Sequence, residues 1–217
     1  MLNSILFLIL AYIIGSFPSG YVITRLSTGK NVLEVGWRKT SGSNVYRHVG
    51  KWQAFVTGFL DIGKGYLAVW LAQNLGFSSQ IQILSGVAAV VGNNWSYFLR
   101  FAGGRGIGTL WGAAIALFPK ILGISVISFA LFSFILNSAI ATFIFLGLVI
   151  FLSIYFNQFA VGGVFTILCL FPIFIKRLSP IKEIFSAKDK GRLVRNRLIF
   201  DNDEARNLLK IKEFFRN

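Results

Sequence analysis

Long apolar stretches with few charges limit most strongly what this sequence can fold into. A helix that crosses a bilayer needs about 20 mostly apolar residues. Of the 217 residues, 55% are apolar and 14% are charged, whereas soluble domains carry about a quarter charged residues. The sequence therefore predicts an integral membrane protein. Candidate spans are Leu2–Val22, Trp52–Leu75, Ile83–Phe101 and Phe159–Ile175, with a further apolar region at 107–156.

The basic residues lie between the apolar spans. The net charge is +14, with six of the 22 Lys and Arg residues in 25–51 and twelve in 176–217. Such clusters are typical of cytoplasmic loops under the positive-inside rule. They favour contact with membrane lipids and anionic substrates, not nucleic acid. We expect a multi-pass protein of the cell (inner) membrane, with its functional site facing the cytoplasm.

The number of spans follows from the sidedness of these loops. The region 107–156 has two interruptions, Pro119-Lys120 and Asn137-Ser138, and fits two or three segments. If all basic loops and the tail are cytoplasmic, an even number of segments lies between residues 107 and 176. Four segments, with breaks near 119, 136 and 157, meet this condition. We expect an all-α polytopic transmembrane helical bundle of about seven membrane segments, with an external N-terminus and a cytoplasmic C-terminal tail.

Two parts of the chain differ in composition. We expect residues 1–176 to form the transmembrane domain and residues 177–217 to form a basic cytoplasmic tail. Residues Glu204–Phe215 space their apolar side chains as a short amphipathic helix does, so that it either lies at the membrane interface or docks on the protein. A secretory signal is the rival interpretation of the first span, but no basic residue precedes Leu2.

Asp61 and Lys64 lie about ten residues inside the second span and share a helix face. A charge in the hydrocarbon is expensive, so such residues are functional candidates. The alternative is a structural pair that neutralises itself. Both interpretations stay open at this point.

A glycine-rich turn precedes the apolar helix that begins near residue 107. It contains Gly103, Gly104, Arg105 and Gly106. Glycines let backbone N–H groups approach an anion, a helix N-terminus favours negative charge, and an arginine donates in pairs to phosphate. The alternative is a flexible tight turn between two helices.

The loop from Gly36 to Arg47 is rich in hydroxyl, amide and cationic donors, which suits a phosphate or acyl-phosphate ligand at the membrane surface. The alternative is a basic loop that only sets topology. One histidine, His48, and one cysteine, Cys169, cannot make a zinc site. We expect no metal and no cofactor, and no nucleophile–base–orienter set is visible.

These motifs together resemble the acyl-phosphate-dependent glycerol-3-phosphate acyltransferases of bacterial membranes. The resemblance covers residues 5 to about 112. The matching segments are Ala11–Tyr21, Gly29-Lys30, Ser43–Arg47, which is similar to T-N-V-x-R, Asp61–Gly65, which fits D-x-x-K-G, and Gly103–Gly106, which is similar to G-G-K-G with Arg for Lys.

The resemblance implies a seven-span bundle that moves a fatty acyl group from acyl phosphate to glycerol 3-phosphate at its cytoplasmic face. It implies catalytic roles for three residues, Lys64, Arg105 and Asn93. It implies substrate-binding roles for Arg38, Lys39, Ser43, Asn44, Arg47, Asp61, Gly103, Gly104, Gly106 and Arg177.

The sequence departs from the family pattern at three places. Gly36-Trp37-Arg38-Lys39 stands where the family has Gly-Ser-Gly-Asn, so the glycine nest is lost and two cations partly replace it. Asn93 stands for a histidine in the third span. In the tail, Arg177 stands for a histidine and Pro180 for an asparagine. Arginine cannot act as a base near neutral pH.

The hypothesis is a membrane acyltransferase of phospholipid synthesis, with acyl phosphate and glycerol 3-phosphate as substrates. The alternative is a catalytically degenerate relative that binds an anionic lipid or partners another membrane protein. A transporter is disfavoured, because only two ionisable residues lie inside a clear span and no half repeats. The acyl chain length and the oligomeric state stay open.

Overall fold

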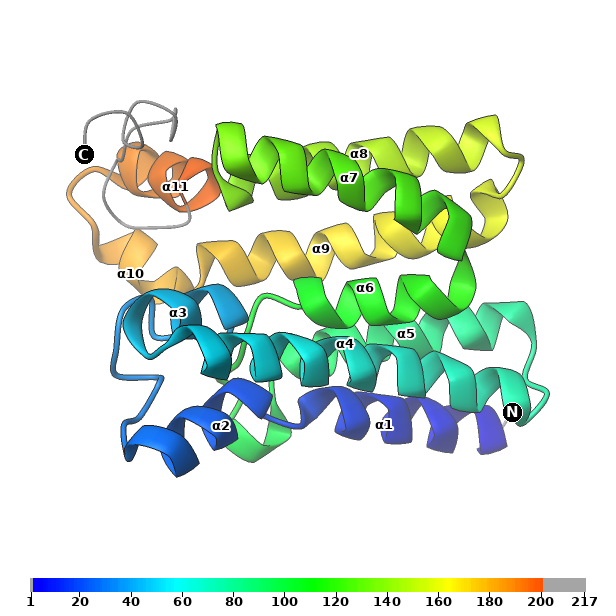
Figure 1. Cartoon of the computed structure of the whole chain (residues 1–217), viewed down its shortest axis with the longest axis horizontal. Coiled ribbons are helices and arrows are strands. Elements are labelled where there is room, and N and C mark those ends of the chain that lie inside the picture. The colour runs from blue at the N-terminus through cyan, green and yellow to red at the C-terminus, as the bar shows by residue number, and fades with distance from the viewer. Residues whose placement is uncertain (1, 201–217) are drawn as a thin grey trace. The chain divides into compact units, whose positions relative to one another are not determined.

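The computed structural model describes residues 2–200, and every regular element in them is helical (Figure 1). The predicted amphipathic helix at 204–215 lies outside the described residues. The helices are α1 (Leu2–Ser16), α2 (Ser19–Thr28), α3 (Gly42–His48), α4 (Lys51–Asn74), α5 (Ser79–Asn94), α6 (Ile107–Leu117), α7 (Pro119–Ile135), α8 (Ser138–Tyr155), α9 (Val164–Leu178), α10 (Ile181–Ser186) and α11 (Lys190–Ile199), with a 3-10 turn at Tyr97–Leu99 and a π-turn at Phe159–Gly163.

The helix boundaries agree closely with the predicted interruptions. The predicted breaks near 119, 136 and 157 fall between α6 and α7, α7 and α8, and α8 and the π-turn. Four helical stretches are long and apolar enough to cross a membrane: Leu2–Thr28, Lys51–Asn74, Ser138–Tyr155 and Phe159–Leu178. The remaining apolar helices, α5, α6 and α7, have 16, 11 and 17 residues. Seven crossings therefore stay a prediction.

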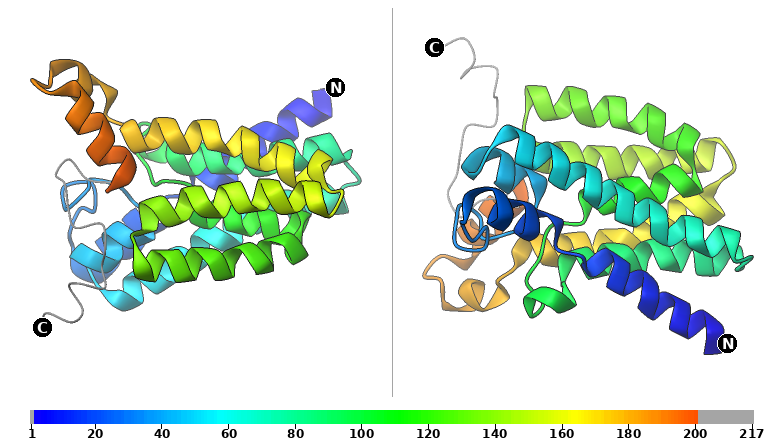
Figure 2. Two further views of the ribbon diagram at one scale, coloured as in Figure 1. Left: turned by 90° about the horizontal axis from the view of Figure 1, so that it is seen from above. Right: turned by 60° about the horizontal axis from the view of Figure 1, so that its bottom comes forward.

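Two predicted spans differ from the structure. The first is not one continuous helix, because it breaks at Phe17-Pro18 and resumes as α2, which runs to Thr28 (Figure 2). Proline has no N–H to donate to the preceding turn, so a helix readily ends before it. The third span lies earlier than predicted, as α5, and ends at Asn94 in a turn. The tail also contains two short helices, α10 and α11.

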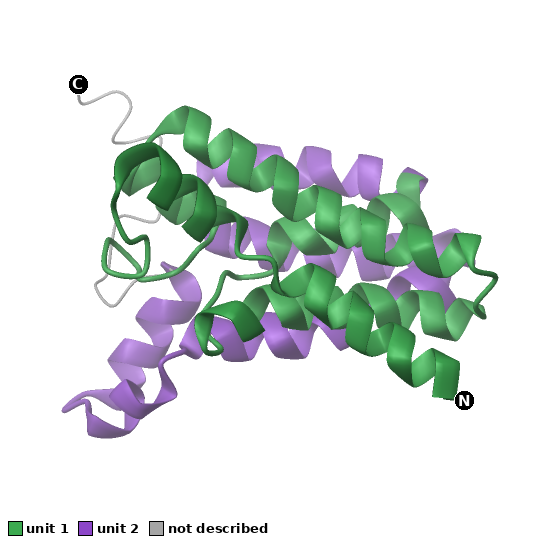
Figure 3. Cartoon of the chain, turned by 90° about the horizontal axis from the view of Figure 1, so that it is seen from below, with its two compact units in different colours: residues 1–119 green, residues 120–217 purple. Residues whose placement is uncertain are grey.

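The chain divides into two compact units, residues 1–119 and residues 120–217 (Figure 3). In the first, α4 is central and contacts α1, α2, α3, α5 and α6. In the second, α8 and α9 pack through the π-turn, and α11 packs on α9. The predicted boundary at 176/177 separates the transmembrane part from the cytoplasmic tail, which is a different division, and it stays a prediction.

Close helix packing in the first unit depends on glycine. A Cβ at Gly65 of α4 would lie 1.9 Å from the Thr109 carbonyl oxygen of α6, and one at Gly112 would lie 1.8 Å from the Ile62 carbonyl oxygen. Gly92 of α5 approaches α1 in the same way. Small residues let membrane helices come into backbone contact. This packing fixes how the loops at the helix ends meet.

Large apolar side chains point outward along the helices. Phe55 and Phe59 of α4 are 75% and 69% exposed, and Phe151 of α8 is 62% exposed. Such surfaces suit a lipid environment, where the hydrophobic effect does not drive these rings inside. In the first unit, the start of α1 and the α4–α5 turn lie at one end and α3 lies at the other (Figure 1).

Candidate functional site

Asn44 of α3 braces the basic loop that precedes it. Its side chain is fully buried. The Oδ1 atom accepts the backbone N–H of Trp37 at 2.9 Å, and the Nδ2 group donates to the carbonyl oxygens of Val32, Val35 and Lys39 at 3.4, 3.1 and 2.8 Å. The Asn44 side-chain amide, for which the family resemblance implies substrate binding, thus forms its hydrogen bonds with the loop backbone.

The loop keeps a left-handed backbone at two positions, Gly36 with φ 56° and Arg38 with φ 55°. The backbone N–H of Arg38 bonds to the Val35 carbonyl oxygen at 3.1 Å, and that of Trp37 bonds to Asn44. Both N–H groups are therefore used inside the loop. An anion here would meet side-chain cations, in agreement with the predicted loss of the glycine nest.

Three polar side chains from α3 and from the glycine-rich turn surround the Trp37 ring. The guanidinium carbons of Arg47 and Arg105 lie over the indole, at 5.2 and 4.9 Å from the ring centroid. The His48 ring meets it edge-on, with centroids 6.0 Å apart. Two arginines that are 58 residues apart in the sequence thus share one aromatic partner.

Arg105 is buried, with 6% of its surface exposed. Its Nη2 group donates to the Ser43 hydroxyl at 2.6 Å and to the Ser41 hydroxyl at 3.3 Å. Both serines lie at the start of α3. The glycine-rich turn and the α3 loop therefore form one cluster, and we call Trp37, Ser41, Ser43, Arg47 and Arg105 the arginine cluster.

The three glycines of the turn pack against the end of α5. The Gly104 N–H donates to the Asn93 carbonyl oxygen at 2.9 Å, and the Gly103 carbonyl oxygen accepts the Thr40 N–H at 3.3 Å. A Cβ at Gly103 would lie 2.4 Å from the Asn93 carbonyl oxygen. Gly106 has φ 76°, which favours glycine directly before α6. The glycines thus place Arg105, and the Gly104 N–H is already bonded.

Lys64, Asp61 and Asn93 form a buried polar network between α4, α5 and the break after α1. The Lys64 ammonium donates to the Phe17 carbonyl oxygen at 2.9 Å and to Asn93 Oδ1 at 2.6 Å, and pairs with Asp61 Oδ1 at 2.8 Å. The same Asp61 oxygen accepts the Ser19 hydroxyl at 2.9 Å. An ammonium has three protons to donate, and here each faces an acceptor.

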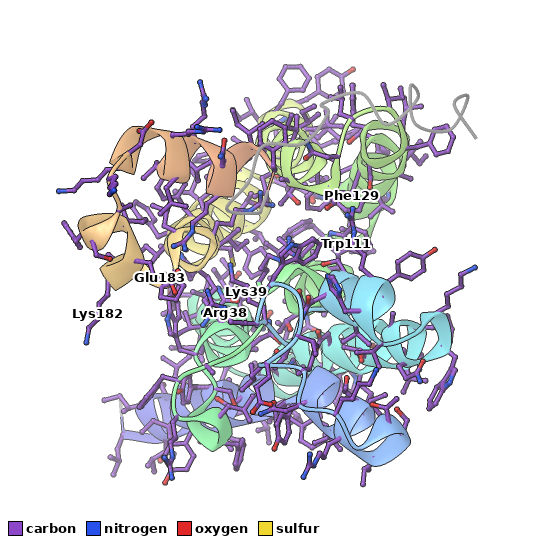
Figure 4. All side chains as sticks on the ribbon, turned by 90° about the vertical axis from the view of Figure 1, so that its left-hand side faces the viewer. Arg38, Lys39, Trp111, Phe129, Lys182 and Glu183 are labelled. Atoms are coloured by element: carbon purple, nitrogen blue, oxygen red, sulfur yellow. The ribbon has the colours of Figure 1, made fainter. Side chains whose placement is uncertain are left out.

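Arg38 and Lys39 lie next to each other on the loop (Figure 4). Arg38 is exposed and Lys39 is half-buried. The Lys39 carbonyl oxygen accepts from Asn44. Their predicted roles as substrate ligands stay predictions.

Arg177 belongs to the second unit, where it is almost fully buried. Its guanidinium carbon lies 4.8 Å from the Phe143 ring centroid, and its Nη1 group donates to the Leu198 carbonyl oxygen of α11 at 3.4 Å. Arg197 of α11 donates back to the Leu178 carbonyl oxygen at the end of α9 at 2.9 Å. These contacts tie α11 to α9, and the substrate role of Arg177 stays a prediction.

The structure thus arranges the predicted residues of the first unit in two groups. Arg105, Ser43 and Arg47 meet in the arginine cluster, and Lys64, Asp61 and Asn93 meet in the buried network. The turn glycines join the two, because Asn93 bonds to Gly104. Sequence reasoning missed Trp37, Ser41 and Ser19. The signal available for Trp37 was an aromatic residue directly before the basic pair Arg38-Lys39. In residues 2–200, no three His, Cys, Asp or Glu side chains gather to hold a metal.

The fold and the arginine cluster define the class of this molecule: it is a helical membrane protein with a basic, hydroxyl-rich cluster among its loops. Comparison with known proteins identifies the family. The family profile described as glycerol-3-phosphate acyltransferase matches residues 5–187. The chain therefore belongs to the glycerol-3-phosphate acyltransferase family, as its motifs predict.

Two relatives illustrate the extent of the similarity. The glycerol-3-phosphate acyltransferase 4 of Dehalococcoides mccartyi (strain CBDB1) is 32% identical over 199 residues, which cover 88% of this chain and 86% of the relative. The glycerol-3-phosphate acyltransferase of Synechococcus sp. (strain CC9902) is 40% identical over 117 residues, which cover 54% of this chain. That match spans only 58% of the Synechococcus protein.

The fold is similar to a solved structure of the same class. The crystal structure of PlsY (YgiH), an integral membrane glycerol 3-phosphate acyltransferase, matches in its glycerol 3-phosphate form with a TM-score of 0.74 and 23% identity, over 85% of this chain and 92% of that one. Its lysophosphatidic acid form matches with a TM-score of 0.68. The predicted all-α, multi-pass membrane bundle is confirmed.

Proposed function

We propose that this chain is a membrane acyltransferase that moves a fatty acyl group from acyl phosphate to the 1-hydroxyl of glycerol 3-phosphate, a step of phospholipid synthesis. The hydroxyl oxygen bonds to the acyl carbon, the bond from that carbon to the phosphate oxygen breaks, and the hydroxyl proton passes to the departing phosphate. The products are lysophosphatidic acid and phosphate. Family membership supports this reaction, as do the ligand forms named for PlsY.

The observation that carries the proposal is the arginine cluster. Arg105 is buried beside two hydroxyls and shares an aromatic partner with Arg47. Guanidinium groups bind phosphate oxygens in pairs, and they are stronger donors where water is excluded. Acyl phosphate is already activated, so orientation and charge neutralisation supply much of the catalysis. We assign anion binding to Arg47, Arg105 and Ser43.

The buried network has a positioning role in this proposal. Asn93 links Lys64 to the glycine turn through Gly104, so that the three residues hold Arg105 at the end of α5. Asn44 does the same for the loop that carries Trp37. We therefore assign Lys64, Asn93 and Asn44 to the support of the site, and not to direct contact with the reacting atoms.

A direct assay tests the function. Purified protein in detergent, given acyl phosphate, should release phosphate only when glycerol 3-phosphate is present. Arg105→Ala should lower kcat/KM about 10²–10³-fold, as loss of one oxyanion donor does elsewhere. Arg25→Ala is the matched control, because Arg25 is exposed and bonds to the Gly29 carbonyl oxygen at the end of α2. Equal effects of the two variants would contradict the assigned role.

The path of the proton has its own test. His48 is the one histidine of the chain and its ring meets the edge of Trp37. If the departing phosphate takes the proton, His48→Gln should lower kcat less than tenfold and leave the pH–rate profile unchanged. A loss of about 10²–10⁴ together with a lost limb of that profile would assign the proton to His48.

A non-catalytic relative that binds an anionic lipid is the second candidate. It is favoured by Asn93, which stands where the family pattern has a histidine and whose oxygen is bonded to Lys64. Binding of glycerol 3-phosphate or acyl phosphate without turnover, under conditions where a relative from Dehalococcoides mccartyi works, would support this candidate over the first.

A further inference from the structure

The guanidinium groups of both cluster arginines, Arg47 and Arg105, lie over the ring of Trp37. It is half-buried, as a ring that covers neighbouring groups would be. Two guanidinium groups near each other repel, and a flexible arginine loses rotamer freedom when it is fixed. Both costs act against a site that needs two cations in place before its anion arrives.

The indole ring offsets these costs. A cation over an aromatic face is attracted to the ring, more strongly where water is excluded, and tryptophan is the best partner. Arg105 is buried, and its guanidinium lies closer to the ring than that of Arg47. Prior placement of both cations reduces the ordering that ligand binding must supply.

We propose that Trp37 is a positioning residue that holds Arg47 and Arg105 ready for the phosphate of the acceptor. The proposal rests on the function proposed above and assigns the cluster to glycerol 3-phosphate. The backbone N–H groups of Trp37 and Arg38 are bonded within the loop. The two arginines on the ring take the place of those donors in binding the anion. The anion site therefore depends on side chains stacked on one ring.

The loop fixes the position of Trp37 itself. Its backbone N–H is bonded to the fully buried Asn44, and the His48 ring packs on its edge. A Cβ at Gly36 would lie 2.2 Å from His48 Cδ2 and 2.4 Å from Asn44 Oδ1, so the preceding residue is held against the same two side chains. An anchored ring can hold two flexible side chains.

The test measures binding of glycerol 3-phosphate and of inorganic phosphate to the full chain in detergent. Fluorinated tryptophans placed at position 37 keep the shape of the ring and weaken its electrostatic face. The dissociation constant should rise stepwise with each added fluorine, by about tenfold in total, since 1.4 kcal/mol corresponds to tenfold. The same fluorinated residues at Trp52, which is 58% exposed, should change nothing. A flat series at position 37 would overturn the proposal.

A double-mutant cycle provides an independent measurement. Lysine carries its charge as a point and lacks the planar group that stacks on an indole. Arg105→Lys should therefore weaken binding about tenfold in the native chain and about threefold or less in a Trp37→Ala background. Equal losses in the two backgrounds would show that the ring and Arg105 act independently, and would overturn the proposal.

These outcomes are separate from those that test the function. Binding is measured without turnover. The fluorinated tryptophans at position 37 therefore test the role of Trp37 even in a chain that transfers no acyl group. Conversely, an active chain whose KM for glycerol 3-phosphate is unchanged by Trp37→Phe and by the fluorinated residues keeps its function and loses this inference. If Trp37→Ala fails to fold, the fluorinated series still decides.

Discussion

At the scale of single residues, two buried polar side chains of the first unit each have several partners. Asn44 makes four hydrogen bonds, and Lys64 makes contacts with three acceptors. Buried polar groups are costly unless they are satisfied, and a satisfied network specifies one arrangement. The residues around the arginine cluster are therefore held by their own bonds before any ligand arrives.

The buried pair of Asp61 and Lys64 yields the first prediction. Lys64→Met leaves a buried carboxylate without its cation, which costs about 3–5 kcal/mol, whereas replacing both charges is far milder. The single variant should lower the midpoint of thermal unfolding in detergent much more than Asp61→Asn/Lys64→Met does. The double variant then separates the two interpretations of the pair. Near-native acyl transfer would mark the pair as structural only, and a stable but inactive protein would mark it as functional.

Asn44 yields the second prediction. Asn44→Ala removes the partner of the Trp37 N–H and of three carbonyl groups, and each buried group left unsatisfied costs about 1–3 kcal/mol. We expect a lower thermal midpoint and faster proteolysis between Val32 and Lys39. Ser43→Ala is the matched control, since it removes a partner of Arg105 and leaves the loop brace intact. It should weaken glycerol 3-phosphate binding with little change in stability. Similar thermal midpoints for both variants would contradict the brace.

At the scale of elements, the break in the first apolar run contributes a contact to the helix packing. Helix α1 ends at Ser16, and the Phe17 carbonyl oxygen accepts the Lys64 ammonium at 2.9 Å. Pro18 has no N–H, so a continuous helix would lose a bond there in any case. The break provides a backbone acceptor inside the bundle, which a regular helix would have used itself.

Glycine packing between α4 and α6 yields the third prediction. A Cβ at Gly65 would lie 1.9 Å from the Thr109 carbonyl oxygen, whereas a Cβ at Gly63, two residues earlier on the same helix, meets nothing within 4 Å. Gly65→Ala should force the helices apart at a cost of about 1–3 kcal/mol. The thermal midpoint should fall by about 5 °C, and Gly63→Ala should leave it unchanged or raise it slightly. Equal stability of the two variants would mean that the helices do not approach as closely as the structure shows.

At the scale of the whole molecule, sidedness connects the charge pattern to the site. The loop between α4 and α5 carries no charge, whereas the segment from α2 to α4 carries the first basic cluster. These two segments lie at opposite ends of the first unit (Figures 1 and 2). The positive-inside rule predicts that the α3 end, and with it the arginine cluster, faces the cytoplasm.

Cysteine labelling in intact cells yields the fourth prediction. The one native cysteine, Cys169, is buried and is first replaced by alanine. A cysteine at Gln80, which is exposed in the first turn of α5, should react with a membrane-impermeant maleimide added outside. A cysteine at Lys30 should react only after the cells are opened. The reverse pattern would place the N-terminus in the cytoplasm and the arginine cluster outside, and would contradict the predicted sidedness.

The amino-acid sequence alone accounts for the helical membrane architecture, the positions of three helix breaks and the family. These are local properties, because a long apolar run becomes a helix in lipid and proline or an Asn-Ser pair interrupts it. Asn137, for example, caps α8 by accepting the N–H groups of Ala139 and Ile140, as its position at the interruption indicates. Motifs in their order then identified the family.

Which polar groups are already bonded depends, in contrast, on how the helices and loops pack against one another. The family resemblance implies substrate binding for Asn44 and catalysis for Lys64. In the structure, both bond to backbone atoms and side chains that packing brings close. The shared contact of Arg47 and Arg105 with Trp37 depends on the segment before α3, α3 itself and the turn before α6 coming together. Such contacts join residues that are far apart in the chain, and no local pattern contains the distance between them.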